Sequence, residues 1–452
     1  MAGCVEPEES KQAGLRPPEK PCYPPDRCNV EESGPKSGPP AMAGARMDGS
    51  SDVNPASEAP PHSPLLPSVA QNQAAEPRGD HAKRPVVRHD RPPSDRPAYA
   101  ALDLGTNNCR LLIAEPTRSG FRVVDSFSRI VRLGAGLTHH GALGIEAMDK
   151  AVEGLRICRT KMDARNVVRR RLIATEACRQ AANGEAFIAR VEKETGLTLE
   201  IADRRTEARL AVSGCATLVE READGVILFD IGGGSTELAF LDFRSGKPRF
   251  HAHMHRFIRA WTSLPVGVVT LAESFGGVYV DRPIFELMVA EVRQMISRFA
   301  AREMMSQCVQ GGNVHLLGTS GTVTTLAGVH LGLERYDRRR VDGTWMGADD
   351  VTAMTDRLID MTFDERVANP CIGADRADLV LAGCAIFEAI RREWPCGRLR
   401  VADRGLREGM LVELMAQDGV WRRDRNGQNG PKGRHGRRGR YRGKRPAQAQ
   451  QN

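Results

Sequence analysis

Three consecutive glycines lie between two apolar runs in the stretch FDIGGGSTELAF, residues 229–240, with an acid on each side. Glycine lets the backbone approach a ligand closely, so the N–H groups of such a loop can converge on one phosphate. A carboxylate beside a phosphate repels it unless a cation lies between them, and Mg²⁺ prefers carboxylate, water and phosphate oxygens. Asp230 and Glu237 therefore predict a site for Mg²⁺ or another divalent cation. The predicted phosphate donors of the loop are Gly232, Gly233, Gly234, Ser235 and Thr236.

Two further turns follow the same logic. The stretch AYAALDLGTNNCRLLIAE ends an apolar run at Asp103, which would face the same cation from the other side of a cleft. Its predicted phosphate donors are Gly105, Thr106 and Asn107. The turn in LLGTSGTVTTLAG (316–328) lies between an apolar run and a helical pattern, and a helix N-terminus offers N–H groups to a phosphate. Its predicted donors are Gly318, Thr319, Ser320, Gly321 and Thr322.

The segments around the turns indicate the fold. Each Asp-Gly turn alone is also explained by a plain β-hairpin, which needs no ligand. Two copies one domain length apart, together with the third turn, favour a phosphate cleft between two lobes. Apolar residues at helical spacing occupy 148–162, 185–195, 284–300 and 377–392. Strands alternating with helices predict an α/β fold, duplicated and two-lobed, with mixed sheets and an interdomain cleft. The predicted lobes are 98–224 and 225–421.

Both ends of the chain differ in composition from this body. The first 97 residues hold 19 of the 27 prolines and keep no helical or strand period, which predicts a disordered leader over 1–97. The segment 422–452 carries 11 Lys and Arg against one Asp, so its net charge of +10 (11 − 1) exceeds the +8 of the whole chain. We expect this tail to be disordered. Residues 422–445 could contact polyanions, or the tail could serve solubility alone.

Composition also bounds the location. No stretch reaches about 18 uninterrupted apolar residues, so no membrane span is expected. The opening MAGCVEPEES lacks the basic and apolar regions of a secretory signal. The 11 cysteines include no CxxC pair, which argues against a disulfide framework and a zinc site. A reducing cytoplasm is the predicted location.

The body resembles the exopolyphosphatase / guanosine pentaphosphate phosphohydrolase (Ppx/GppA) family, a branch of the actin-like superfamily. The matching segments keep the family's order over almost all of 98–415, and the most specific are ATEACRQAAN (174–183) and TEARLAVSG (206–214). The other segments are DLGTNNCRLLIAE, RLGAGL, DIGGGSTELAF, SLPVGVVTLAE, GTSGTVTTLAG, RADLVLAG and GLREGML. Because the basic tail follows GLREGML directly, we expect a short form without the HD-type C-terminal domain of longer members.

The resemblance implies an activity and roles for residues. It implies Mg²⁺-dependent hydrolysis of terminal phosphoanhydrides in inorganic polyphosphate or in pppGpp, the alarmone of the bacterial stringent response. It implies that Glu207 activates the attacking water and that Arg179 contacts the phosphate chain. It also makes a guanosine tetraphosphate ligand and a homodimer expectations. Thr206 departs from the family pattern, which has a glutamate before the catalytic one.

Two other classes of function stay open. One is an ATP-dependent kinase of the same superfamily, and the other is a non-catalytic regulator that binds alarmone or polyphosphate. Some residues are better explained by structure. Arg376 and Asp378 are expected to begin a helix, with the acid near its positive end. Glu408 is expected at an exposed helix position, and the family resemblance keeps a role at the lobe interface open. The histidines of FHAHMHRF (250–257) are expected on one face of a strand.

Overall fold

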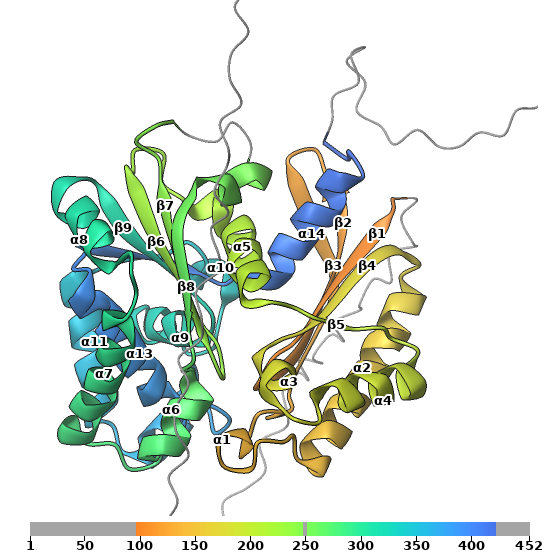
Figure 1. The fold of residues 1–452 in the computed structure, drawn as a ribbon, viewed down its shortest axis with the longest axis horizontal. Helices are drawn as coiled ribbons and strands as arrows, with labels where there is room; N and C mark the ends of the chain where they lie inside the picture. Colours follow the sequence, from red (N-terminus) through yellow and green to blue (C-terminus); the bar gives the residue numbers. More distant parts are fainter. Residues whose placement is uncertain (1–95, 247–250, 422–452) are drawn as a thin grey trace, which may run out of the picture. The chain divides into compact units, whose positions relative to one another are not determined.

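The computed structural model describes residues 96–246 and 251–421, all of which lie in the second of two compact units, Val87–Asn452. The predicted tail, and the predicted leader up to residue 95, lie outside the described residues. Two β-sheets organise this unit, and they come from successive halves of the body (Figure 1).

The first sheet has the strand order β3-β2-β1-β4-β5. Its strands are β1 (Ala98–Leu104), β2 (Asn108–Thr117), β3 (Gly120–Ile130), β4 (Val167–Ala174) and β5 (Glu200–Ile201). The helices connecting them are α1 (Leu137–His140), α2 (Ile145–Ala164), α3 (Glu176–Gln180) and α4 (Gly184–Thr195). Side chains along β1 alternate between two cores, as the strand period requires. Ala100 and Leu102 pack with residues of α2 and α4, whereas Tyr99 and Ala101 pack with a helix from the end of the chain.

The second sheet has the order β10-β11-β9-β6-β7-β8. Its strands are β6 (Gly225–Ile231), β7 (Thr236–Asp242), β8 (Ile258–Leu264), β9 (Val314–Thr319), β10 (Trp345–Gly347) and β11 (Arg398–Ala402). The helices from this part of the chain are α5 (Arg204–Cys215), η1 (Ala216–Leu218), η2 (His251–Phe257), α6 (Val268–Phe275), α7 (Arg282–Ser297), α8 (Arg302–Gly311), α9 (Gly321–His330), α10 (Arg338–Val341), α11 (Ala348–Asp360), α12 (Phe363–Ala368), α13 (Val380–Glu393) and α14 (Leu406–Gln417). Helices α7, α9 and α13 share one core with Phe229, and α5 shares another with Leu228.

The two sheets repeat one pairing scheme, which confirms the predicted duplicated α/β fold. In the first, β1 pairs antiparallel with β2 and parallel with β4. In the second, β6 pairs antiparallel with β7 and parallel with β9. The cross-strand partners at equivalent positions differ. Asp103 lies opposite Arg110, whereas Asp230 lies opposite Glu237.

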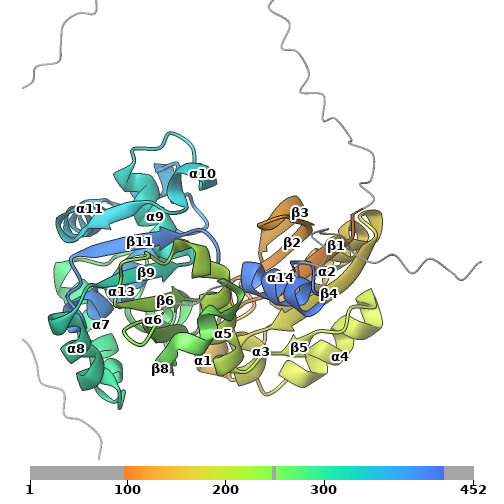
Figure 2. The ribbon, with the colours of Figure 1, turned by 90° about the horizontal axis from the view of Figure 1, so that it is seen from above.

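Helices α5 and α14 cross beside the first sheet, and Figures 1 and 2 both show α14 against β1 and β4. A Cβ on Gly214 would lie 1.9 Å from the Gly405 carbonyl oxygen, and one on Gly409 would lie 2.0 Å from that of Leu210. Only glycine therefore permits this backbone contact. The lobe limits 98–224 and 225–421 remain a proposal. Helix α14 belongs to the second range by sequence but packs on the first sheet, because its apolar side chains complete that sheet's second core.

The predicted helices correspond to α2, α4, α7 and α13. Helix α7 ends at Ser297 and α13 begins only at Val380, so Arg376 and Asp378 do not begin it. The histidines expected on a strand instead occupy the 3₁₀ helix η2, whose period does not align alternate residues. Within the described parts of the chain, no helix combines the length and apolarity needed to cross a bilayer.

Candidate active site

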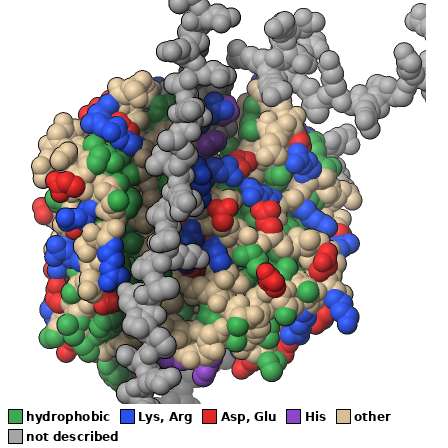
Figure 3. Space-filling model, viewed as in Figure 1, with side chains coloured by type: hydrophobic (Ala, Val, Ile, Leu, Met, Phe, Trp, Pro, Cys, Tyr) green, Lys and Arg blue, Asp and Glu red, His purple; other side chains and the backbone are tan. Residues whose placement is uncertain are grey.

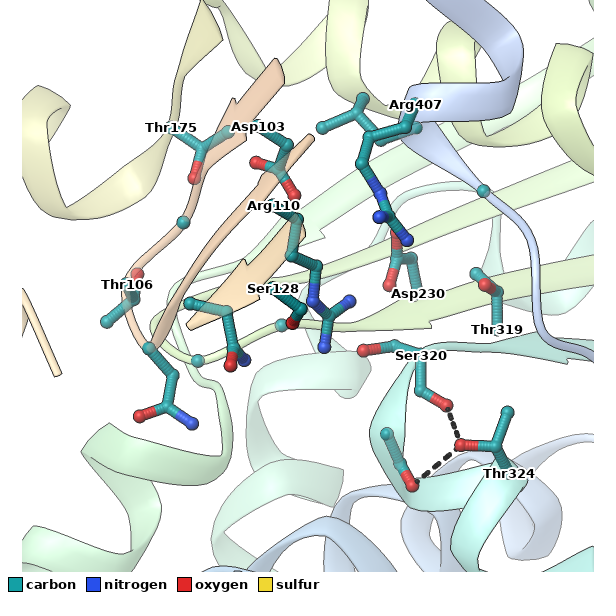
Figure 4. A pocket seen from close by; sticks show the side chains of 18 of the residues that line it. Asp103, Thr106, Arg110, Ser128, Thr175, Asp230, Thr319, Ser320, Thr324 and Arg407 are labelled. Atoms are coloured by element: carbon teal, nitrogen blue, oxygen red, sulfur yellow. Dashed lines mark hydrogen bonds between the residues drawn. The ribbon is translucent and has the colours of Figure 1, made fainter. Parts of the chain in front are cut away.

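The three glycine-rich turns meet in one pocket of about 480 Å³, lined by residues of both sheets and of α14 (Figure 4). Most of the predicted site residues line it. They are Asp103, Gly105, Thr106, Asn107, Glu207, Asp230, Gly232, Gly233, Gly234, Ser235, Glu237, Thr319, Ser320 and Gly321.

The β6–β7 turn is closed by a hydrogen bond from the Gly232 N–H to the Ser235 carbonyl, 2.9 Å. It packs against the β1–β2 turn of the other sheet. A Cβ on Gly233 would lie 2.8 Å from Cβ of Thr106, closer than real Cβ contacts. The glycine therefore serves two purposes, because it frees the backbone N–H groups and lets the turns of the two lobes touch.

The third turn precedes α9. Ser320 has φ +82°, a backbone region that L residues rarely occupy. Its carbonyl accepts a hydrogen bond from the Thr324 hydroxyl, 3.0 Å, one turn into the helix (Figure 4). Strained residues of this kind are held by their surroundings and concentrate at binding sites. The strain presents the first N–H groups of the ten-residue helix α9 to the pocket.

Three acids line the pocket without a cation of their own. Burial raises the pKa of Asp230 to about 7, and the nearby charges of Glu237 and Asp103 add to the rise. Burial also raises the pKa of Asp103 and of Glu237, although Glu237 accepts hydrogen bonds from the hydroxyls of Ser235 (2.8 Å) and Ser263 (2.9 Å). Crowded buried carboxylates are unfavourable unless a positive group joins them.

A divalent cation would relieve this crowding of carboxylates. Among the residues that the structure describes, no group of three or more His, Cys, Asp or Glu side chains is arranged as a metal cage. Mg²⁺ does not need one, because it commonly keeps its waters and takes one or two carboxylates plus phosphate oxygens. Asp230 and Glu237, paired across the hairpin, supply such a partial set.

Positive charge enters the pocket from three arginines that the sequence interpretation did not single out as phosphate ligands. In the described part of the chain, Arg110, Arg376 and Arg407 line the pocket and form no ion pair. Figure 4 shows Arg110 and Arg407 reaching into it from the strand β2 and from α14. The predicted hairpin pairs Arg110 with Asp103, and this pairing could have placed Arg110 at the site. Arg407 lies in the GLREGML segment, but nothing local predicts that α14 returns to the first sheet.

Glu207 lies in the first turn of α5, and 8% of the residue is exposed. The helix is capped by Asp203, whose carboxylate accepts from the Thr206 N–H, 2.7 Å. This gives Thr206 a local role as a capping partner. Burial raises the pKa of Glu207 to about 9, the charge of Glu237 adds to the rise, and Arg179 opposes it. Once ionised, a carboxylate whose pKa is raised is a stronger proton acceptor than an ordinary glutamate.

Arg179 binds Glu207 from outside the pocket lining. Its guanidinium also donates to Glu176 and to the Ala202 carbonyl. Glu176 is 2% exposed and accepts a second guanidinium, Arg204, at 2.6 Å. The pair of arginines neutralises the buried Glu176 and fixes Arg179 behind Glu207.

Three other predicted residues also lie outside the lining of this pocket. The Thr236 hydroxyl donates to the Val266 carbonyl, 2.7 Å, within the core. A Cβ on Gly318 would lie 2.5 Å from the Phe229 ring, so this glycine allows strand packing. Thr322 packs against Gly383 of α13 and lines a smaller neighbouring pocket.

Two interpretations of individual residues were wrong. Glu408 is buried, not exposed, because it completes the N-terminal cap of α14 by accepting from the Gly405 N–H, 2.9 Å, and pairs with Arg338 at 2.7 Å. Asp378 does not begin a helix. It forms an ion pair of 2.9 Å with Arg132, which belongs to the first half of the body.

Known proteins share both the sequence pattern and the fold of this chain. Residues 112–418 match the model of the Ppx/GppA phosphatase family. "Exopolyphosphatase 2" of Mycobacterium tuberculosis is 26% identical over 332 residues, which cover 70% of this chain and 98% of the relative. "Guanosine-5'-triphosphate,3'-diphosphate pyrophosphatase" of Aeromonas salmonicida is 25% identical over 323 residues, 71% of this chain and 60% of that protein. The crystal structure of the Aquifex aeolicus Ppx/GppA family member has a TM-score of 0.57 and 28% identity, covering 71% of this chain and 98% of that one.

The duplicated actin-like fold, together with exopolyphosphatase and pyrophosphatase relatives, indicates a phosphoanhydride hydrolase. The chain belongs to the Ppx/GppA phosphatase family.

Proposed function

We propose that the chain removes terminal phosphates from inorganic polyphosphate, from pppGpp, or from both, in a reaction that depends on Mg²⁺ or another divalent cation. One observation carries the proposal. The buried carboxylate of Glu207 lines the same pocket as three glycine-rich turns and three arginines without an ion pair.

The phosphate chain would lie on the three turns, with its oxygens accepting from backbone N–H groups and from Arg110, Arg376 and Arg407. Phosphoryl transfer needs positioning and charge neutralisation more than covalent help. Glu207 accepts a proton from a water whose oxygen attacks the terminal phosphorus, and the bond to the bridging oxygen breaks. The shortened chain leaves with the electron pair of that bond.

Asp230 and Glu237 would hold the cation, with Asp103 facing it from the first sheet. When bound, the cation would neutralise charge on the phosphate oxygens and relieve the repulsion among these acids. Ser235 and Ser263 keep the Glu237 carboxylate in place through its Oε1.

We assign Arg179 a positioning role, because its contacts aim it at Glu207 and not at the pocket. This differs from the phosphate contact that the family resemblance implies. A cytoplasmic location, a homodimer and polyanion binding by 422–445 remain predictions. Figure 3 adds one relevant feature, a gathering of Lys and Arg side chains in the middle of the molecular face, over α5. Arg205 of α5 is exposed, and its charge would guide an anionic chain toward the pocket.

The decisive experiment compares the wild-type chain with Glu207→Gln, which keeps the side-chain shape and removes the proton acceptor. We expect the wild type to release phosphate from polyphosphate or pppGpp with Mg²⁺ and to stop with EDTA. The variant should lose at least about 100-fold in kcat and still bind substrate. The exposed Glu185→Gln on α4 is the matched control.

The alternatives have distinct outcomes. A kinase would transfer phosphate only when an acceptor is supplied, and a binding regulator would bind without releasing phosphate. Undiminished phosphate release by Glu207→Gln would contradict the role given to that residue.

A further inference from the structure

One face of the second sheet carries charged and aromatic side chains at the end formed by β9, β11 and β10. Met346, Leu399 and Val401 pack into the core that these strands share with α13. Side chains at the alternate positions of the same strands therefore lie on the opposite face. Trp345 and Arg400 are direct cross-strand partners on that face. Helix α5 packs on β6, β7 and β8, whereas these two residues at the other end of the sheet are half-buried.

Two guanidinium groups lie against the Trp345 ring. Those of Arg398 and Arg400 are each 4.7 Å from the ring centroid, and His315 packs edge-on against the same ring. A guanidinium that stacks on an aromatic ring still has its N–H groups at its edge, where they can donate. Arg398 donates to the carboxylate of Glu220.

Arg400 lacks an acceptor for its N–H groups. Among the described residues it forms no ion pair, and its buried Nε has no hydrogen-bond partner. Burial lowers the pKa of Arg400, although the charges of Asp342 and Glu220 oppose the shift. The Cβ position of Gly343 lies 3.3 Å from its Nη2, and the φ of this glycine is +91°, so the loop is fitted closely around the guanidinium. A half-buried cation without an acceptor is unfavourable, and an anion would relieve it.

The two acids near Arg400 are engaged by other arginines. Glu220 pairs with Arg398, and Asp342 accepts from Nε of Arg404 at 3.0 Å. Three arginines and two carboxylates leave this group of side chains with an excess of positive charge.

Helix α10 adds further positive charge beside the group. Arg339 and Arg340 are exposed. The Arg340 carbonyl accepts from the Thr344 hydroxyl, 2.7 Å, which ties the helix to the residue before Trp345. Several neighbouring cations attract a multivalent anion more strongly than a monovalent one. The edge of a guanidinium also matches two oxygens of one phosphate. The chemistry therefore favours a phosphate group over chloride.

We propose that Arg400, stacked on Trp345, forms a second phosphate-binding site on the outer face of the second sheet. Neither residue lines the active pocket, so this site is separate from the one that holds Glu207. Its ligand is free orthophosphate or the terminal phosphate of a longer inorganic chain, which present the same oxygens. The inference goes beyond the proposed function and does not depend on it, because it concerns binding alone.

Trp345 provides a local readout for the test. Fluorescence of the full chain is titrated with orthophosphate at an ionic strength held constant with chloride. We expect a saturable change in the wild type that is lost in Trp345→Phe, which keeps an aromatic ring. Arg400→Met keeps a long apolar stem on the ring but removes the donors, so the Kd should rise at least about tenfold. Arg293→Met removes an exposed arginine of α7 and should keep the wild-type Kd.

Calorimetry separates this site from the active pocket. Orthophosphate and tripolyphosphate are each titrated, with EDTA present, into the wild type, Arg400→Met and Arg407→Ala. Loss of one binding event in Arg400→Met and of a different one in Arg407→Ala supports the proposal even if the chain hydrolyses nothing. The ligand whose binding Arg400→Met weakens more identifies the occupant as free phosphate or a chain. A wild type that responds equally to chloride overturns the proposal even if hydrolysis is confirmed. So does an unchanged phosphate response in an Arg400→Met variant that keeps the native circular dichroism spectrum.

Discussion

Arg179 holds the carboxylate of Glu207 from behind the pocket wall and does not itself line the pocket. The buried Glu176 forms an ion pair with the same arginine and a second ion pair with Arg204. Side chains of two helices, α3 and α5, therefore fix one carboxylate, which is the arrangement expected for a group that must orient a single water.

This network predicts that Glu176→Gln impairs catalysis without weakening substrate binding. We expect kcat to fall roughly tenfold, part of a general base's contribution, while KM changes less than about twofold. Steady-state phosphate release gives both parameters, and Glu176→Asp should restore part of kcat because it keeps the charge. A rise in KM with unchanged kcat would show instead that Glu176 contributes to substrate binding.

Loss of one of the unpaired pocket arginines should weaken substrate binding, whereas loss of Glu176 should lower kcat. Arg407→Ala removes a cation that faces the phosphates, so KM should rise about tenfold or more, as for a hydrogen bond between charged groups. The effect should shrink at high salt. Arg407→Lys should recover part of the affinity. The exposed Arg221→Ala is the control, and an equal change in that variant would reduce the effect to net charge.

The crowded acids predict a conflict between stability and activity. Asp230→Asn removes one of three mutually repelling buried charges, so the metal-free chain should be more stable by about 1 kcal/mol. Calorimetric unfolding should also show a smaller rise of Tm on adding Mg²⁺ than in the wild type. A variant that keeps the full Mg²⁺-induced rise would exclude Asp230 from the cation site.

His315 predicts a pH dependence of folding away from the pocket. Its ring is fully buried between strands, donates from Nδ1 to the Leu316 carbonyl at 3.0 Å and packs edge-on against Trp345. Burial lowers the pKa of His315 below its ordinary value of 6.5, so the unfolded chain binds the proton more readily. Its contribution to stability is therefore complete above pH 6.5 and is lost as the pH falls toward the folded-state pKa.

Urea unfolding at pH 7.5 and 5.5 measures this contribution. From pH 7.5 to pH 5.5, the free energy of unfolding of the wild type should fall by about 1 kcal/mol more than that of His315→Gln. Equal losses in the two proteins would mean that the folded chain accepts the proton on His315 without cost.

The turns were predictable because their chemistry is local. Asp230 and the glycines after it form a pattern that neighbouring residues complete, and the same holds for Asp103 and the β1–β2 turn. The hairpin pairing and the duplication follow from the same local patterns. Residues whose role depends on distant chain segments could not be found this way.

Arg407 and Tyr336 illustrate the limit. Arg407 reaches the pocket because α14 packs on the first sheet, some 300 residues from β1 along the chain, and apolar periodicity does not name the surface that a helix covers. Tyr336 lines the pocket, and its hydroxyl donates to Asp403, which lies 67 residues further along the chain. Glu408 looked exposed because its partner Arg338 lies 70 residues earlier and meets it only in the folded chain.

The backbone contact between α5 and α14 has a consequence for how product leaves. Gly214 and Gly409 bring two carbonyl groups against facing backbone, with no side chain to slide or compress. Glu273 of α6 accepts from the Gly136 N–H (2.8 Å) and the Thr138 hydroxyl (2.9 Å), contacts that can break individually. We therefore expect any opening of the pocket to be a rotation about this crossing, which would separate the Thr106 turn from the Gly233 turn.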